Sequence, residues 1–417
     1  MRLETPHRSG KARGWLITWV LVVIIAEVVF LNSVVRERGL FDYIGLDYRG
    51  SRAAGEAILE HGLGAAYDSS LLEDSQRQLY DRHTIESTRY GLPFYVVPAP
   101  YPPPFTLAFV PSTWLPPVQG FVAWTLFHAV VLTLYLLRVA RVFGVPRPGW
   151  LIVAVAISFP AFINFIMGQL SVWLVVFFGE ALIAFEQRRH LKSGAWLGLL
   201  VCKPQVLVLI VPALALARQW KVLLGMVASV AVLIVPTLVF AGDWVSGFIQ
   251  GIFDTAGSTG RVMNTFPSSM TNWRAFALNS ARIYPSSIVW AFALVAMVAT
   301  GIAGLLCSAG LRVTDRRQTG LAWLGLAAAT CAFSWHAHVH QILLMAPPLF
   351  VVLSIWPHLT DTVVRILLGT SAMFVLAAFT LSVGEAHDIL GGTLLGCLVA
   401  ITAICALVLH SQWFVRE

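Results

Sequence analysis

The sequence is poor in charge, since only 12% of its 417 residues are Asp, Glu, Lys or Arg, while 58% are hydrophobic. Soluble domains carry about 25% charged residues. This chain therefore cannot cover a surface in water, which excludes a soluble enzyme and a disordered scaffold. Cysteine is also scarce. The five cysteines lie in apolar stretches without the spacing of a metal site, which excludes a disulfide-stapled secreted module and leaves buried structural thiols.

The charge pattern typical of nucleic-acid binding is missing too. The net charge is +7, but the sequence has no basic amphipathic face and no Cys/His finger spacing. We therefore expect no nucleic-acid partner. No low-complexity segment, equal-period repeat or appended soluble stretch occurs, so residues 1–417 are predicted to form a single domain.

Long apolar runs are present instead, many of them about 20 residues long, enough for a helix to cross a hydrocarbon core of ~30 Å. They predict an all-α polytopic membrane protein. Segment 193–217 is interrupted at Lys203–Pro204 and predicts a hairpin of two short helices, giving about 12 transmembrane helices in all, between about 10 and 13. Segment 105–116 predicts a short helix on or dipping into the membrane. The other spans are expected near 15–35, 118–138, 148–166, 169–186, 221–241, 286–308, 319–334, 341–356, 364–383 and 388–410.

The basic residues predict the orientation of these spans. Lys and Arg concentrate in the short connections on one side, and short cytoplasmic connections are enriched in these residues. We therefore expect both termini in the cytoplasm, with residues 1–14 as a cytoplasmic tail. The long first loop 36–104 and the loop 242–285 are expected on the external, periplasmic face of the inner or plasma membrane, where they would form an active-site face.

The first external loop is rich in acidic residues, and most of them fit a solvated face. Asp42 and Asp47 differ because they follow the end of the first span closely. Partial desolvation at a membrane boundary raises the pKa of a carboxyl group and makes it a better base. Asp47 also opens a helix-like stretch, so the alternative interpretation is an N-cap.

Three more polar features interrupt apolar surroundings. Tyr101, a candidate for binding the donor phosphate or sugar, precedes three prolines, which fix an extended segment and then allow a helix to start. Gln169 follows Gly168 in a tight turn and could bind sugar hydroxyls or only satisfy the turn. Lys203 could hold a phosphate, because an intramembrane lysine is costly, or it could extend to the interface.

A histidine-rich turn and a basic loop complete the candidates. Trp335, His336 and His338 suit hydrogen bonding to phosphate and stacking on a sugar ring, whereas a metal is the less favoured interpretation, because further ligands are not evident. Arg261 and Arg274 lie in the loop 242–285 and suit an anion, or they are ordinary interfacial anchors. Together these groups suit a lipid-phosphate substrate, with a carboxylate as general base and cations stabilising the departing phosphate.

The order of these motifs resembles glycosyltransferase family 87. The resemblance covers roughly 15–410 and follows Asp47–Tyr48 with Ala53–Ala54 and Tyr67–Asp68, the Tyr101–Phe105 segment, Gly168–Gln169, Lys203–Pro204 and the His336/His338 turn. It implies a GT-C fold related to actinobacterial polyprenyl-phosphate-mannose-dependent mannosyltransferases. It also implies inverting transfer of a sugar from a polyprenyl-phosphate donor to a glycolipid or glycan acceptor, with Asp47 as the catalytic base. His336 or His338 would lie on the donor-phosphate side.

The sequence leaves several alternatives for the sugar, the cofactor and the function. Mannose is the default sugar and arabinofuranose the other candidate. We expect a monomer. We also expect no cofactor, because loop 36–104 has no Asp-x-Asp pair, although a divalent metal is the alternative. The rival function is a lipid-linked sugar transporter or flippase, with Lys203, Glu27 and Glu180 lining a path.

Overall fold

The described part of the chain is helical. The computed structural model describes residues 8–38, 44–84, 96–99, 101–257, 270–381 and 387–414; these ranges contain no β-strand, and an isolated bridge joins Met270 and His338. The predicted all-α class is therefore confirmed. The helices are α1 (Arg8–Arg38), α2 (Leu46–His61), α3 (Ser69–Thr84), α4 (Pro103–Thr106), α5 (Val110–Thr113), α6 (Pro117–Phe143), α7 (Gly149–Ala156), α8 (Phe159–Met167), α9 (Ser171–Glu186), α10 (His190–Gly198), α11 (Leu207–Leu216), α12 (Trp220–Ala241), α13 (Trp244–Gly257), α14 (Trp273–Ser280), α15 (Ser286–Leu306), α16 (Arg316–Phe333), α17 (Ala346–Ile355), α18 (Thr360–Leu381) and α19 (His387–Phe414).

Among the described residues, five helices are long and apolar enough to cross a membrane, in α1, α6, α12, α15 and α19. Two bent helix pairs raise the number to at most seven, α7 with α8 at 48° and Val339–Ile355 with Pro357–Val375 at 119°. The membrane architecture is thus supported, whereas the count of about 12 is not confirmed. The difference lies in the broken segments. The 16-residue helix α9 is only ~24 Å long, and 193–217 divides at Lys203 into the still shorter α10 and α11.

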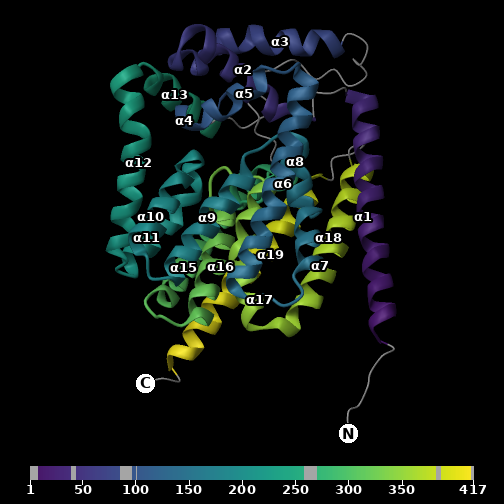
Figure 1. The fold of residues 1–417 in the computed structure, drawn as a ribbon, viewed down its shortest axis with the longest axis vertical. Helices are drawn as coiled ribbons and strands as arrows, with labels where there is room; N and C mark the ends of the chain where they lie inside the picture. The colour runs from purple at the N-terminus through teal and green to yellow at the C-terminus, as the bar shows by residue number, and fades with distance from the viewer. Residues whose placement is uncertain are drawn as a thin grey trace.

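Helix α2, which carries Asp47, lies at one end of the molecule (Figure 1). There α3 lies across the top of the bundle above α2, with α4, α5 and α13 beside it. Residues 36–104, predicted as a long loop, therefore contain two 16-residue helices in their described part. The start of α1 and the end of α19 lie at the opposite end.

The bundle core and its outer surface are both apolar. Buried side chains of α6, α9 and α16 form the main core, including Trp323 at 1% exposure. By contrast, α12 and α15 expose large apolar side chains such as Phe240 and Val295. A helix with apolar residues on its outward face suits contact with lipid.

Helix α2 is held in place by a buried arginine. Arg52 donates from Nη1 to the carbonyl of Ser112 (2.5 Å), from Nη2 to that of Thr113 (3.2 Å) and from Nε to Glu56 (2.9 Å). Its side chain is 6% exposed. The Glu56 carboxylate in turn accepts a hydrogen bond from Ser75 of α3. This charge therefore joins α2 to α3 and α5, although the composition of the loop suggested a solvated face.

We predict that Arg52→Ala lowers the free energy of unfolding by about 2–4 kcal/mol, because two buried carbonyls and a carboxylate lose their donor. Arg77→Ala on α3 is the matched control. It breaks a solvent-exposed pair with Glu73 and should change stability by less than about 1 kcal/mol. Unfolding by sodium dodecyl sulfate in mixed micelles measures both variants. Equal effects would show that Arg52 does not anchor α2.

Candidate active site

Asp47 lies in the first turn of α2 and is half-buried. Gly45 takes the N-cap position, with φ of 71°, and no side chain caps the helix. The interpretation of Asp47 as an N-cap is therefore wrong. Its carboxylate Oδ2 instead accepts a hydrogen bond of 2.5 Å from Nε2 of Gln169, a residue 122 positions further along the chain.

The orientation of the Gln169 amide follows from its other partners. Its Oε1 accepts from Nζ of Lys203 at 2.7 Å and from the hydroxyl of Tyr101 at 3.0 Å. Lysine and this tyrosine hydroxyl are both donors here, so the oxygen must face them and the NH₂ group must face Asp47. One amide thus carries a cation and a hydroxyl on one side and a carboxylate on the other. The three residues linked to Asp47 in this network are buried: Gln169 is 7% exposed, Lys203 is 6% exposed and Tyr101 is 1% exposed.

The turn between α8 and α9 brings Gln169 to α2. Gly168 ends α8 with φ of +73°, and a Cβ atom there would lie 2.5 Å from Cβ of Tyr48. The carbonyl of Gly168 accepts from Nε1 of Trp124 (3.1 Å), while the N–H of Gly45 donates to the carbonyl of Ile166 (2.5 Å). The close approach of the two segments therefore requires a residue without a side chain.

Contacts of its ring and of its backbone carbonyl fix the position of Tyr101. The Tyr101 ring stacks on Phe109 at 6.0 Å. Its carbonyl accepts from the hydroxyls of Tyr67 (2.6 Å) and Thr106 (3.0 Å). Because Tyr101 is almost fully buried, its hydroxyl supports Gln169 from inside the protein.

The histidine turn lies between α16 and the 3₁₀ turn at Val339–Met345. Nε2 of His336 and Nε2 of His338 are 3.1 Å apart, so one of the two rings donates and the other accepts. The His338 ring stacks on His340 at 5.8 Å, and Nδ1 of His340 contacts Oγ of Ser171 at 2.7 Å. Ser171 opens α9, two residues after Gln169, so the histidine turn and the carboxylate network share one helix end.

His336 is surrounded by positive charge. Burial, together with the nearby positive charges of Lys203 and Arg274, lowers the pKa of His336 to about 4. The imidazole is therefore neutral at pH 7. At this position the ring can hydrogen-bond to a ligand, while the cationic charge comes from Lys203 and Arg274.

Arg274 approaches the turn from α14. Its guanidinium carbon lies 5.1 Å from the centre of the Trp335 ring, which stacks on Trp290 at 6.3 Å. The N–H of Thr271 donates to the carbonyl of Ala337 at 2.9 Å, which fixes the start of α14 beside the histidine turn. Arg274 is 3% exposed and Trp335 is 41% exposed, so the ring forms the outer edge of this cluster.

The structure therefore brings most of the predicted residues into two adjoining clusters, one around Asp47 and one around the histidine turn. Asp42 and Arg261 lie outside the described residues. The sequence motifs indicated no role for Ser171, His340 or Gln205. Nε2 of Gln205 donates to the carbonyl of His336 at 3.4 Å. Each of these three residues lies within one or two residues of a predicted position, and a polar side chain beside an apolar run was the available signal. Across the described residues, no group of three or more His, Cys, Asp or Glu side chains could hold a metal ion.

This arrangement suits a reaction that moves a proton and develops negative charge. A half-buried carboxylate with fixed orientation can accept a proton. Lys203 and Arg274 are two cations in buried surroundings, where they stabilise an anion more strongly than in water.

Comparison with known proteins gives one match. The family model described as glycosyltransferase family 87 matches residues 100–347, more than half of the chain. The matched range includes every candidate residue of both clusters except Asp47. The comparisons with curated proteins and with solved structures found no match.

We predict that Gly168→Ala disrupts this site, and Gly144→Ala is the matched control. Both glycines end a helix, with φ of +73° and +72°, but a Cβ atom at Gly144 would meet nothing within 4 Å. Gly144→Ala should therefore cost only about 1–2 kcal/mol of backbone strain. Gly168→Ala adds the collision with Tyr48, about 1–3 kcal/mol more. Equal losses of unfolding free energy in the two variants would contradict the close packing of the turn on α2.

Proposed function

The chain belongs to glycosyltransferase family 87 and is a membrane glycosyltransferase, and from this premise we propose that it transfers a sugar from a polyprenyl-phosphate donor with inversion at the anomeric carbon. The observation that carries the proposal is the hydrogen bond from Gln169 to the Asp47 carboxylate, with Lys203 bonded to the same amide. The Gln169 amide is thus bonded to a candidate base through its nitrogen and to a candidate phosphate ligand through its oxygen.

The proposed reaction is a single displacement. The acceptor hydroxyl loses its proton to Asp47 as its oxygen forms a bond to the anomeric carbon, and the bond between that carbon and the phosphate oxygen breaks. The donor is a phosphodiester with one negative charge, and the released polyprenyl phosphate is a monoester that gains a second. Lys203 and Arg274 would stabilise this added charge. The neutral ring of His336, together with His338, would hydrogen-bond to the phosphate or the sugar.

Gln169 and Tyr101 have a different role in this proposal. Because the hydroxyl of Tyr101 bonds to Gln169 and the ring is 1% exposed, we assign both residues to positioning the Asp47 carboxylate. Trp335, at the exposed edge of the histidine turn, is the better candidate for stacking on a sugar ring, since aromatic faces suit such contacts.

An apolar surface beside the site supports a lipid-carried substrate. Ring contacts run from Trp124 through His128 to Trp173 at the start of α9. They continue from Trp173 through Phe177 to Trp196 of α10, with centroid distances of 6.0 and 6.2 Å. Trp124 and His128 are buried, whereas Trp173, Phe177 and Trp196 are partly exposed. The partly exposed rings suit contact with an isoprenoid chain, while the sugar and phosphate lie at the helix end.

The proposal extends to the sugar, the acceptor and the position of the protein in the membrane. We propose mannose as the sugar, with arabinofuranose as the alternative, a glycolipid or glycan acceptor, and no need for a divalent metal. We also propose a monomer in the plasma membrane with cytoplasmic termini and an external active site. The common end of α2 and α3, opposite the start of α1 and the end of α19, supports this orientation (Figure 1).

A transporter or flippase is the less supported alternative. Its suggested path would use Lys203, Glu27 and Glu180. Lys203 bonds to Gln169 at one end of α9, whereas Glu180 pairs with Arg138 near the other end, at 2.7 Å. These separate partners favour chemistry at one helix end over a continuous polar path.

We predict that Asp47→Asn lowers kcat at least about 100-fold, because the amide cannot accept the acceptor proton, while the KM for the donor changes little. Glu60→Gln on the same helix is the control and should keep full activity, since Glu60 is exposed. The assay uses purified protein with polyprenyl-phosphate mannose, polyprenyl-phosphate arabinofuranose and a nucleotide sugar as separate donors.

Each result of this assay bears on one part of the proposal. Undiminished transfer by Asp47→Asn would show that Asp47 is not the base. Transfer from the nucleotide sugar alone would contradict the lipid-phosphate donor. Movement of intact lipid-linked sugar across vesicles, without transfer and without dependence on Asp47, would favour the flippase.

A further inference from the structure

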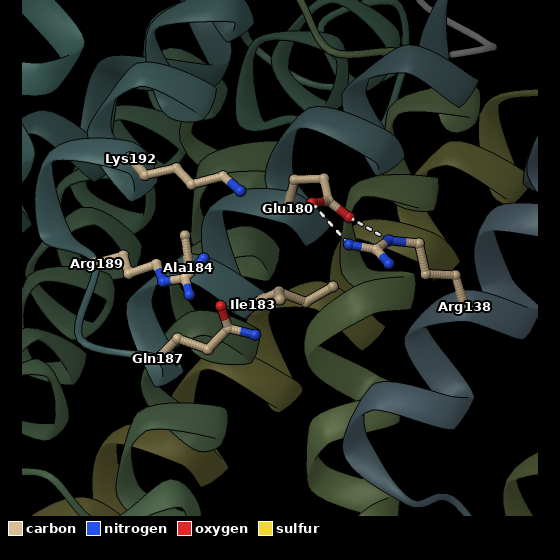
Figure 2. A pocket seen from close by; sticks show the side chains of 7 residues that line it. All are labelled: Arg138, Glu180, Ile183, Ala184, Gln187, Arg189 and Lys192. Atoms are coloured by element: carbon tan, nitrogen blue, oxygen red, sulfur yellow. Dashed lines mark hydrogen bonds and ion pairs between the residues drawn. The ribbon is translucent and has the colours of Figure 1, made fainter.

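A second charged site lies far from Asp47. A cavity of about 280 Å³ forms where α6, the end of α9 and the start of α10 meet. Ser171 and Glu186 bound α9, so the cavity is more than half of a ~24 Å helix away from the candidate active site. Its lining residues are Arg138, Glu180, Ile183, Ala184, Gln187, Arg189 and Lys192, and Figure 2 shows the polar ends of the charged ones directed into the same space.

The charges around this cavity do not balance. Arg138 forms a two-point ion pair with Glu180, from Nε at 2.7 Å and from Nη2 at 3.1 Å (Figure 2). Within the described residues, the side chains of Arg189 and Lys192 have no hydrogen-bond or ion-pair partner. Three cations and one carboxylate leave the lining with a net charge of +2 at neutral pH.

The start of α10 adds to this positive field. Arg189 occupies the N-cap position, no side chain caps the helix, and the first helical hydrogen bond runs from Ser193 to the carbonyl of Arg189. The N–H groups that precede Ser193 in the first turn lack an acceptor within the helix, and such a helix end carries a partial positive charge. An oxyanion is the ligand that matches a pocket of this composition.

Exposed leucines lie close in the chain to two of the lining cations. Leu134 lies one turn before Arg138 on α6 and is 60% exposed, and Leu191 precedes Lys192 and is 53% exposed. Cations with exposed leucines nearby suit the zone where a membrane passes from hydrocarbon to polar head groups. A lipid phosphate meets both requirements, because its charge enters the pocket while its acyl chains contact the leucines.

We propose that this pocket binds the phosphate of an anionic phospholipid on the side of the membrane opposite Asp47. Arg189 and Lys192 contact the phosphate oxygens. The Arg138–Glu180 pair forms the rigid wall, and Gln187 supplies a neutral hydrogen-bond donor. This site does not depend on the proposed function, since neither the donor sugar nor Asp47 takes part.

Native mass spectrometry of the full chain released from micelles tests the proposal with phosphatidylglycerol and phosphatidylcholine. Wild type should retain phosphatidylglycerol in preference to phosphatidylcholine. The double variant Arg189→Ala, Lys192→Ala should bind phosphatidylglycerol roughly 10- to 30-fold more weakly, since each cation near an anionic head group contributes about fivefold. The swapped variant Arg189→Lys, Lys192→Arg keeps both charges and should keep most of the binding.

The matched control is Arg141→Ala, Lys221→Ala, which removes two exposed cations outside the lining and should bind as wild type does. Thermal unfolding of each variant separates lost binding from lost folding. Equal lipid retention by the pocket variant and the control would overturn the proposal. Inorganic phosphate is the second probe: variant-sensitive binding of phosphate without any preference for phosphatidylglycerol would overturn the lipid as its source.

Discussion

The candidate active site depends on one buried amide. Gln169 bonds to a carboxylate through its nitrogen and to an ammonium and a hydroxyl through its oxygen. A carboxylate and an ammonium in a low-dielectric interior attract each other strongly. The amide lies between them and satisfies both, so neither charge has to move for the other to be hydrogen-bonded. If the Gln169 side chain were absent, Asp47, Lys203 and Tyr101 would all lose a partner.

The site forms where helices break. Three interruptions meet at this end of the bundle: the Gly168 turn, the break at Lys203 and the histidine turn. Backbone groups freed by a break inside a membrane protein need partners within the protein. They find them here: the N–H of Gln169 bonds to the carbonyl of Asn164, and that of Lys203 to the carbonyl of Leu200. The breaks therefore bring polar side chains into the bundle while these two backbone N–H groups keep their partners.

The two charged regions of the protein differ in how their charges are matched. Around Asp47, the carboxylate and Lys203 are both hydrogen-bonded to Gln169, and the side chains of Gln169 and Lys203 are buried. Around Arg138, two further cations remain solvent-accessible beside one ion pair. The first pattern suits a site that must keep a fixed geometry. The second suits reversible attraction of an anion from outside.

The sequence by itself determined the class of the protein, because low charge and long apolar runs leave only a helical membrane bundle, and the order of its motifs indicated the family. It also located Asp47, Gln169, Lys203 and the histidine turn as polar interruptions. It did not determine the number of spans, because apolar composition does not show whether helices as short as α9, α10 and α11 cross a membrane. Only the tertiary structure joined Asp47 to Gln169, and Arg52 of the presumed loop to α5, since these contacts link residues 122 and 60 positions apart. Periodicity and composition report on neighbours within a helix, and contacts between distant segments arise from packing.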